Sequence, residues 1–356
     1  MKLNKVQITV GVIGAGMISE KHIASFQKTG KVNVTWVADI NESLLNEVKA
    51  KYSIQNSTKD YHEILKDASV DLVVIATPPK MHFPMLKDCL EANKHVLIEK
   101  PAAISLPELN EMLELRKKYP HLLVMDPSCR HARLQPKFSF VKSIIDSGKL
   151  GDIYYIHHNS TFRQGRGGIE YHPAAKWFLN KAIAGGGPML DWGVYDFSFH
   201  LGIMGDKPEL IEVKSAYTIN GLDKVDPGTP IFDVEEHGFA LLQFTGGLKY
   251  YWERSSNAHV DVPNETRIYG TKGGLKFSFC SWDPTEVEFF DVADDGKGKA
   301  RSEIMKVDMS KHINDEYHLA EHVVDTMLNG AEYQMPLERA AKHLDIILKV
   351  YQAAKN

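Results

Sequence analysis

The chain has few cysteines, no long apolar run and no excess of positive charge. Its three cysteines, Cys89, Cys129 and Cys280, lie far apart without metal-ligand spacing, which argues against a disulfide framework and indicates a reducing, cytoplasmic environment. A formal net charge of −4 lacks the basic footprint of a nucleic-acid-binding protein. No apolar stretch approaches the length needed to span a bilayer, so no membrane association is expected.

The sequence has the length, the composition and the alternation of strand and helix patterns that are typical of a two-domain globular protein. At 356 residues it is too long for one ordinary core, and 43% apolar with 25% charged residues is typical of a soluble chain. Between residues 6 and 126, buried-type strands alternate with helical segments, which predicts a doubly wound parallel sheet. We therefore expect one domain over residues 1–127 and a second α/β domain over residues 128–356.

A glycine-rich turn follows the first expected strand. Residues 7–13 form a β-branched run that meets Gly14-Ala15-Gly16-Met17-Ile18-Ser19, a GxGxxG pattern with a small serine in the last place. The glycines permit a tight turn and close backbone approach to a pyrophosphate, which then sits at the N-terminus of the following helix. Gly14, Gly16, Met17 and Ile18 are the expected cofactor contacts.

The second expected strand, over residues 32–38, ends in an acidic residue. Asp39 stands where a dinucleotide-binding fold places the carboxylate that accepts hydrogen bonds from both ribose hydroxyls. Against a 2′-phosphate it is a like charge, and neither Ile40 nor Asn41 offers a compensating cation. NAD is therefore favoured over NADP.

Polar residues also follow two further buried strands, residues 71–76 and 96–98. Ligands of open α/β sheets bind beyond the carboxyl ends of the strands, so a lysine placed there points at the bound molecule. Pro101 fixes φ after that lysine and stiffens the turn. The expected cofactor-binding residues at these strand ends are Thr77, Pro78, His82, Glu99 and Lys100.

With the glycine turn, Asp39, Ala76-Thr77-Pro78 and Glu99-Lys100-Pro101 in this order, the chain resembles the Gfo/Idh/MocA oxidoreductases. The resemblance implies a Rossmann domain followed by an α/β domain with a large, mostly antiparallel open sheet, which often forms the interface of a homodimer or homotetramer. It also implies hydride transfer between NAD(P) and a secondary hydroxyl of a sugar, polyol or sugar derivative. Lys100 would contact the nicotinamide ribose and the substrate hydroxyl, and the Lys100–Pro101 bond is often cis in this family.

The resemblance further assigns a pair of residues in the second domain. Glycines 185–187 and Pro188 mark a helix start, and Asp191 and Tyr195, four residues apart, share one face of that helix. The family places an aspartate and a histidine at these positions, and tyrosine is found in its sugar-oxidising and dihydrodiol-oxidising branches. Tyr195 is expected to act as the acid/base and Asp191 to orient the substrate, with Lys100 as the third catalytic residue.

Two further residues are candidates for substrate contacts. Arg163 lies in a loop expected over residues 162–168, which is either a flap over the substrate or a solvated loop. Trp177, like Trp192, is expected either to stack on the apolar face of a sugar or to lie in the core. The histidines show no ligand spacing with a carboxylate, so no metal site is expected.

The main functional hypothesis is an NAD-dependent dehydrogenase with a small, sugar-like substrate. Two alternatives stay open. One is an enzyme that cleaves glycosides by transient oxidation of the ring and elimination, and the other is a non-catalytic regulator that senses NAD or a sugar.

Overall fold

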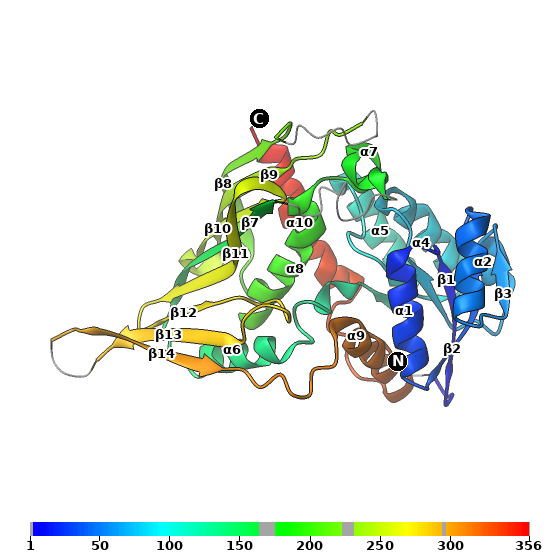
Figure 1. Cartoon of the computed structure of the whole chain (residues 1–356), viewed down its shortest axis with the longest axis horizontal. Coiled ribbons are helices and arrows are strands. Elements are labelled where there is room, and N and C mark those ends of the chain that lie inside the picture. The colour runs from blue at the N-terminus through cyan, green and yellow to red at the C-terminus, as the bar shows by residue number, and fades with distance from the viewer. Residues whose placement is uncertain (1–2, 164–174, 223–230, 294–296, 356) are drawn as a thin grey trace. The chain divides into compact units, whose positions relative to one another are not determined.

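The computed structural model describes residues 3–163, 175–222, 231–293 and 297–355 (Figure 1). Contacts divide the chain into two compact units, Met1–Arg130 with Ile313–Lys342, and His131–His312 with His343–Asn356. The first unit thus includes a segment from near the C-terminus. The division into domains at residues 127 and 128 stays a prediction. Within the described residues, no helix has both the length and the apolar character required to cross a membrane.

The first unit contains a six-stranded parallel sheet in the order β3-β2-β1-β4-β5-β6, which confirms the predicted doubly wound fold. Its central strands are buried on both faces, as expected when helices cover the two sides of a parallel sheet. The strands are β1 (Ile8–Ile13), β2 (Val32–Ala38), β3 (Asn56–Thr58), β4 (Leu72–Ile75), β5 (His95–Ile98) and β6 (Val124–Met125).

Two helices of the first unit begin after residues whose side chains cap them. The side chain of Asn41 accepts hydrogen bonds from the first turn of α2, and Ser105 caps α5 through the Glu108 N–H. The helical elements are α1 (Met17–Lys28), α2 (Glu42–Lys51), α3 (His62–Lys66), η1 (Pro79–Met81), α4 (His82–Glu91), α5 (Leu106–Lys118), η2 (Pro127–Cys129), α9 (Asp315–Val324) and the π-helical η5 (Asp325–Asn329). The last helix, α10 (Leu337–Ala353), begins in this unit and continues into the second.

The second unit contains an eight-stranded sheet in the order β14-β13-β12-β11-β7-β10-β9-β8. It is mostly antiparallel, as expected, but β7 and β10 pair in parallel. The strands are β7 (Ile153–Arg163), β8 (Leu210–Ile219), β9 (His237–Phe244), β10 (Lys249–Ser255), β11 (Asn257–Gly270), β12 (Gly274–Phe277), β13 (Glu286–Val292) and β14 (Ala300–Lys306). Because β7 extends to Arg163, residues 162 and 163 of the expected loop belong to a strand instead.

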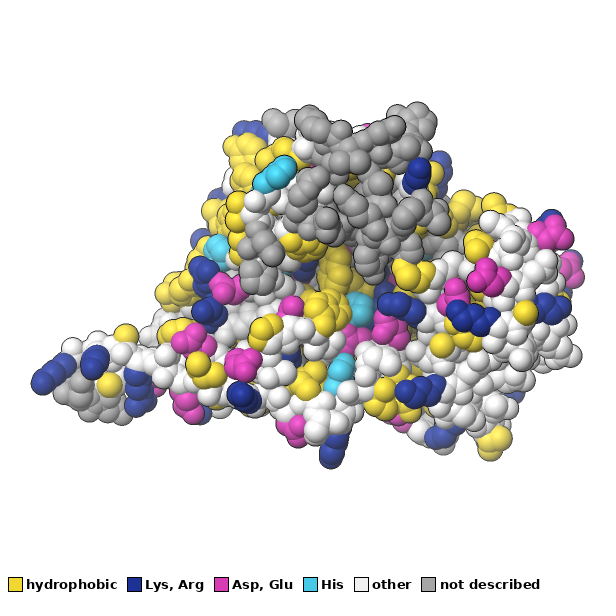
Figure 2. Space-filling model, viewed as in Figure 1, with side chains coloured by type: hydrophobic (Ala, Val, Ile, Leu, Met, Phe, Trp, Pro, Cys, Tyr) yellow, Lys and Arg dark blue, Asp and Glu magenta, His cyan; other side chains and the backbone are white. Residues whose placement is uncertain are grey.

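Helices cover one face of this sheet (Figure 1), and α8 (Pro188–Ile203) packs against β9 and β10. A Cβ on Gly193 would meet the Trp252 ring at 2.5 Å, so glycine allows α8 to approach β10 closely. The other helical elements are α6 (Pro136–Asp146), η3 (Lys176–Leu179), α7 (Lys181–Ala184) and η4 (Thr245–Gly247). Figure 2 shows charged side chains of both signs interspersed over the face in view.

Candidate functional site

The glycine turn after β1 has two glycines with different physical roles. Gly14 has a φ of +106°, and a Cβ there would meet the Ala76 carbonyl oxygen at 2.5 Å, so the fold itself requires glycine. Gly16 is the N-cap of α1 and has no strained φ, and a Cβ on it would meet nothing within 4 Å. No side chain caps this helix, so its N-terminus offers backbone N–H groups to an anion.

Asp39 lies directly after β2 and faces the glycine turn. Its Oδ2 accepts a hydrogen bond from the Ala15 N–H at 2.7 Å, and its Oδ1 accepts one from the Asn41 N–H at 2.7 Å. Each carboxylate oxygen retains acceptor capacity, as the two hydroxyls of a ribose require. Together with the open space at Gly16, this arrangement fits the dinucleotide predicted from the sequence.

The imidazole of His82 lies between the turns that follow β4 and β5, within hydrogen-bond distance of a carbonyl oxygen in each turn. It is fully buried, with Nε2 2.9 Å from the Thr77 carbonyl oxygen and Nδ1 2.9 Å from the Pro101 carbonyl oxygen. Burial lowers the pKa of His82, which favours the neutral ring, and a neutral ring donates to one of the two carbonyls. The structure thus brings the turns after β4 and β5 together, and the Lys100–Pro101 bond is cis.

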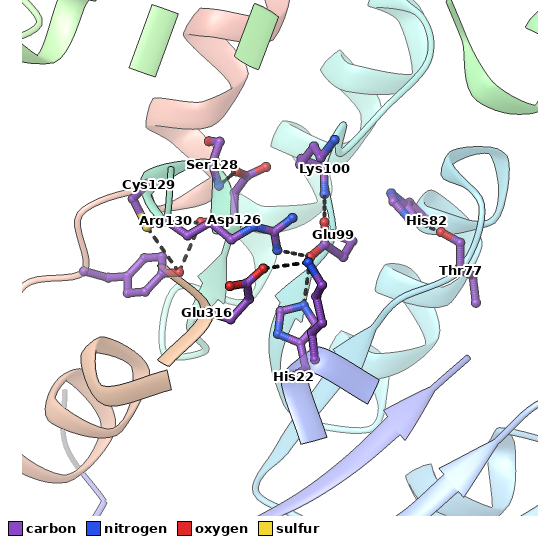
Figure 3. Close-up of polar contacts among 12 residues, drawn as sticks. His22, Thr77, His82, Glu99, Lys100, Asp126, Ser128, Cys129, Arg130 and Glu316 are labelled. Atoms are coloured by element: carbon purple, nitrogen blue, oxygen red, sulfur yellow. Dashed lines mark hydrogen bonds and ion pairs between the residues drawn. The ribbon is translucent and has the colours of Figure 1, made fainter. Parts of the chain in front are cut away.

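Glu99, at the end of β5, lies at the centre of a buried polar cluster (Figure 3). Its Oε1 accepts hydrogen bonds from His22 at 2.8 Å and from Arg130 at 2.6 Å, and its Oε2 accepts one from the Lys100 N–H at 3.1 Å. Burial opposes ionisation, but the charges of Arg130, His22 and Lys100 hold the pKa of Glu99 well below its usual range. Glu99 is therefore a buried carboxylate whose contacts are made by the protein itself.

In the second unit, Pro188 opens α8, and Asp191 and Tyr195 follow one helical turn apart on the same face. Both are buried, with 8% and 1% of their surface exposed. Around Tyr195, the His131 ring lies edge-on at 4.8 Å and the Trp192 ring at 5.2 Å between centroids. The structure therefore brings Asp191 and Tyr195 together as predicted. Lys100 belongs to the other unit.

Sequence reasoning missed two residues of the aromatic cluster around Tyr195. Trp282, in the turn after β12, contacts the rings of His131 and Trp192 at centroid distances of 5.3 and 5.8 Å and stays 60% exposed. His131 comes shortly after β6, so its position beyond a strand end was a usable signal. Trp282 had no such signal, because only tertiary packing brings it to α8.

A second missed group anchors α8 to the sheet. Asp196 is fully buried and accepts hydrogen bonds from Trp252 Nε1 at 2.8 Å and from Arg254 Nε at 2.6 Å, with His158 Nε2 at 3.1 Å. Burial opposes its ionisation, but Arg254 and His158 lower the pKa of Asp196 far below its usual range. The Arg254 guanidinium also lies 5.1 Å from the Trp192 ring centroid, which holds that indole beside Tyr195.

The structure describes the side chain of only one of the two predicted substrate contacts, Arg163 and Trp177. Arg163 is the last residue of β7, but its side chain and residues 164–168 of the expected loop lie outside the described residues. Trp177 lies half-buried in η3, with its ring stacked on Phe178 at 3.8 Å between centroids. Its contact with a substrate stays a prediction. Among the described residues, no group of three or more His, Cys, Asp or Glu side chains is arranged to hold a metal ion.

A doubly wound sheet with a glycine turn after β1 and an acid after β2 defines a Rossmann-type nucleotide-binding protein. Residues 8–126 match the model of an oxidoreductase family with an NAD-binding Rossmann fold, and residues 138–276 match the GFO/IDH/MocA C-terminal domain. The chain belongs to the GFO/IDH/MocA family of oxidoreductases.

Relatives of known activity are distant. Levoglucosan dehydrogenase of Pseudarthrobacter phenanthrenivorans is 25% identical over 317 residues, covering 82% of this chain and 78% of that protein. Trans-1,2-dihydrobenzene-1,2-diol dehydrogenase of Bos taurus is 29% identical over 281 residues, covering 78% and 76%. The solved structure of a levoglucosan dehydrogenase in complex with NADH and levoglucosan matches with a TM-score of 0.82 at 20% identity, covering 98% of this chain and 97% of that one.

Proposed function

We propose that the protein is an NAD-dependent dehydrogenase of the tyrosine-type branch, acting on a secondary hydroxyl of a cyclic sugar, polyol or sugar derivative. The observation that carries the proposal is Lys100, which follows the buried strand β5 and Glu99 in a chain of this oxidoreductase family. Membership in the family supports hydride transfer with NAD. The activities of the distant relatives, a levoglucosan dehydrogenase and a dihydrobenzenediol dehydrogenase, support a ring-shaped alcohol as substrate.

The proposed roles follow from the chemistry of each side chain. Bound NAD accepts or supplies the hydride. Lys100 stabilises negative charge on the substrate oxygen with its ammonium group, and Tyr195 takes the hydroxyl proton during oxidation. Asp191, one turn away from Tyr195 on α8, accepts a hydrogen bond from a neighbouring hydroxyl and so orients the ring. The aromatic rings around Tyr195 exclude water from the phenol.

A substrate screen tests the proposal. Sugars, polyols and glycosides, including levoglucosan and myo-inositol, are incubated with NAD while the absorbance of NADH is followed. We expect NADH to form with at least one ring-shaped alcohol and not with matched deoxy compounds. Cleavage of a glycoside without net NADH would support the oxidation–elimination alternative. Sugar binding without turnover of any compound would support the regulator and contradict the proposal.

A further inference from the structure

We infer that Glu99 is a positioning residue for Lys100, fixing the lysine's backbone and holding its side chain in the charged form. The inference rests on the proposed role of Lys100. The clearest observation is that the buried Glu99 carboxylate accepts a hydrogen bond from the N–H of the lysine that follows it. A residue that serves only to fill the strand end has no need of a charge, which is costly to bury.

The geometry ties Lys100 to two other elements through this carboxylate. His22 comes from α1, the helix that begins at the glycine turn, and Arg130 comes directly after η2 (Figure 3). The two bind the same oxygen, Oε1, and leave Oε2 for the Lys100 N–H. The backbone of Lys100 is therefore held on one side by Glu99 and followed on the other by Pro101, whose φ is fixed.

The electrostatics act in the same direction. The Lys100 charge contributes to the lowered pKa of Glu99, and because the attraction is mutual, the carboxylate favours the charged form of the lysine. Without that carboxylate, the positive charge of Arg130 disfavours a charged Lys100 side chain, and His22 adds to the repulsion when protonated. Neutralising Glu99 is therefore expected to promote loss of the Lys100 proton.

Other titratable groups lie near the Glu99 cluster, so a test of the Lys100 charge needs a control for their effect. Burial, together with the Glu99 charge, raises the pKa of Asp126 to about 6, and burial lowers the pKa of His82. On the outer side, Lys21 pairs with Glu316 at 3.0 Å. Asp126 is the matched control, since it is a second buried carboxyl of the same cluster whose hydrogen bond is to the Ser128 N–H.

Competitive labelling with acetic anhydride tests the charge without needing a substrate. The full-length protein is labelled across a pH series, and mass spectrometry reports the reactivity of the Lys100 amine separately from other lysines. In Glu99→Gln, we expect the midpoint of the Lys100 titration to fall by about one pH unit, the shift that loss of a nearby opposite charge produces. Asp126→Asn should shift it much less, and Lys94, which donates to the Asp67 and Val70 carbonyls, should not shift in either variant. An unchanged Lys100 midpoint in folded Glu99→Gln would overturn the inference.

A double-mutant cycle tests the effect on turnover, using the sugar that the screen identifies. Glu99→Gln should reduce kcat in the native background and have little further effect when combined with Lys100→Met, since both act through one ammonium group. Glu99→Asp keeps the charge and should restore the labelling midpoint. If Glu99→Gln fails to fold, the cycle is run with Glu99→Asp, which keeps the charge but whose shorter side chain withdraws the carboxylate from the Lys100 N–H. Additive losses would contradict positioning, whereas full activity of Lys100→Met alone would contradict the proposed role of the lysine.

Discussion

At the scale of single residues, we predict that Asp39 decides which dinucleotide binds. Its two oxygens accept hydrogen bonds from the N–H groups of Ala15 and Asn41, which fixes the carboxylate where we expect the ribose. A 2′-phosphate about 4 Å away would be opposed by roughly 4 kcal/mol at an effective dielectric of 20. We expect NADH to bind at least about tenfold more tightly than NADPH, and Asp39→Ala to narrow the difference. Fluorescence titration with both cofactors measures it, and equal affinities in the unmodified protein would refute the assignment.

We predict that Asp126 makes the free energy of unfolding depend on pH. Burial, with a contribution from the Glu99 charge, raises its folded pKa to about 6 from a usual value of 3.8. A raised pKa means that this carboxyl favours folding most below pH 3.8 and loses that effect as the pH rises through about 6. Asp126→Asn removes the penalty while its amide oxygen still accepts the Ser128 N–H. Relative to wild type, the variant should gain about 1.5 kcal/mol more unfolding free energy at pH 8 than at pH 5. Denaturant unfolding at the two pH values measures this gain, and a difference independent of pH would be inconsistent with a buried, titrating Asp126.

Tyr195 stands at the position where the resemblance implies a histidine. A phenol has to lose its proton to act as the base in oxidation, so the rate should rise with pH through its folded pKa. Tyr195→Phe keeps the buried ring and its contacts with His131 and Trp192 but removes the hydroxyl. It should lower kcat on the order of 10²-fold and flatten the alkaline rise, with NADH affinity nearly unchanged. Steady-state rates across pH measure both effects. An unaltered rate and profile would place the base elsewhere.

At the scale of elements, the turn between β1 and α1 contains Gly14, which the fold requires, and Gly16, which we expect to face the cofactor. Gly14→Ala forces a left-handed φ on alanine and a 2.5 Å contact with the Ala76 carbonyl oxygen, so it should lower the melting temperature as well as NADH affinity. Gly16→Ala meets open space in the protein and should leave the melting temperature nearly unchanged while weakening NADH binding. Thermal unfolding and fluorescence titration on both variants make the comparison. A Gly14→Ala variant as stable as Gly16→Ala would show that the turn relaxes.

The elements that sequence patterns predicted are those with a strong apolar signal. β1, β4 and β5 are buried on both faces, so their apolar runs were recognisable in the sequence, and the polar residues after β5 indicated Lys100. Asp39 was indicated by its place directly after β2. β8 and β14 are mostly exposed rather than buried, and neither was predicted. The resemblance implied a mostly antiparallel sheet, but β10 pairs in parallel with the distant β7, which no local pattern encodes. His131 and Trp282 reach α8 through the same kind of long-range packing.

The eight-stranded sheet has two faces of different character. Tyr250 and Trp252 are fully buried and contact Phe197 of α8, while the alternate residue Tyr251 points to the opposite face. On that face, the rings of Tyr251 and His157 stack at 4.8 Å, and those of Tyr217 and Phe239 stack at 5.2 Å between centroids. Tyr217 is 40% exposed, so this face presents aromatic surface to solvent in the isolated chain.

At the scale of the whole molecule, we predict that this aromatic face is buried by a second copy of the chain in a dimer, or in a tetramer built from dimers. A two-fold interface presents the same patch from both copies, and half-buried aromatic rings are suited to it because they bury large areas at low entropic cost. Light scattering at micromolar concentration should give two or four times the mass of one chain. Phe239→Lys places a charge from each copy in the interface and should shift the protein toward monomer. Val6→Lys, at a residue 91% exposed in the other unit, is the matched control and should not change the mass. A monomer in the unmodified protein would show that solvent, rather than a partner, covers this face.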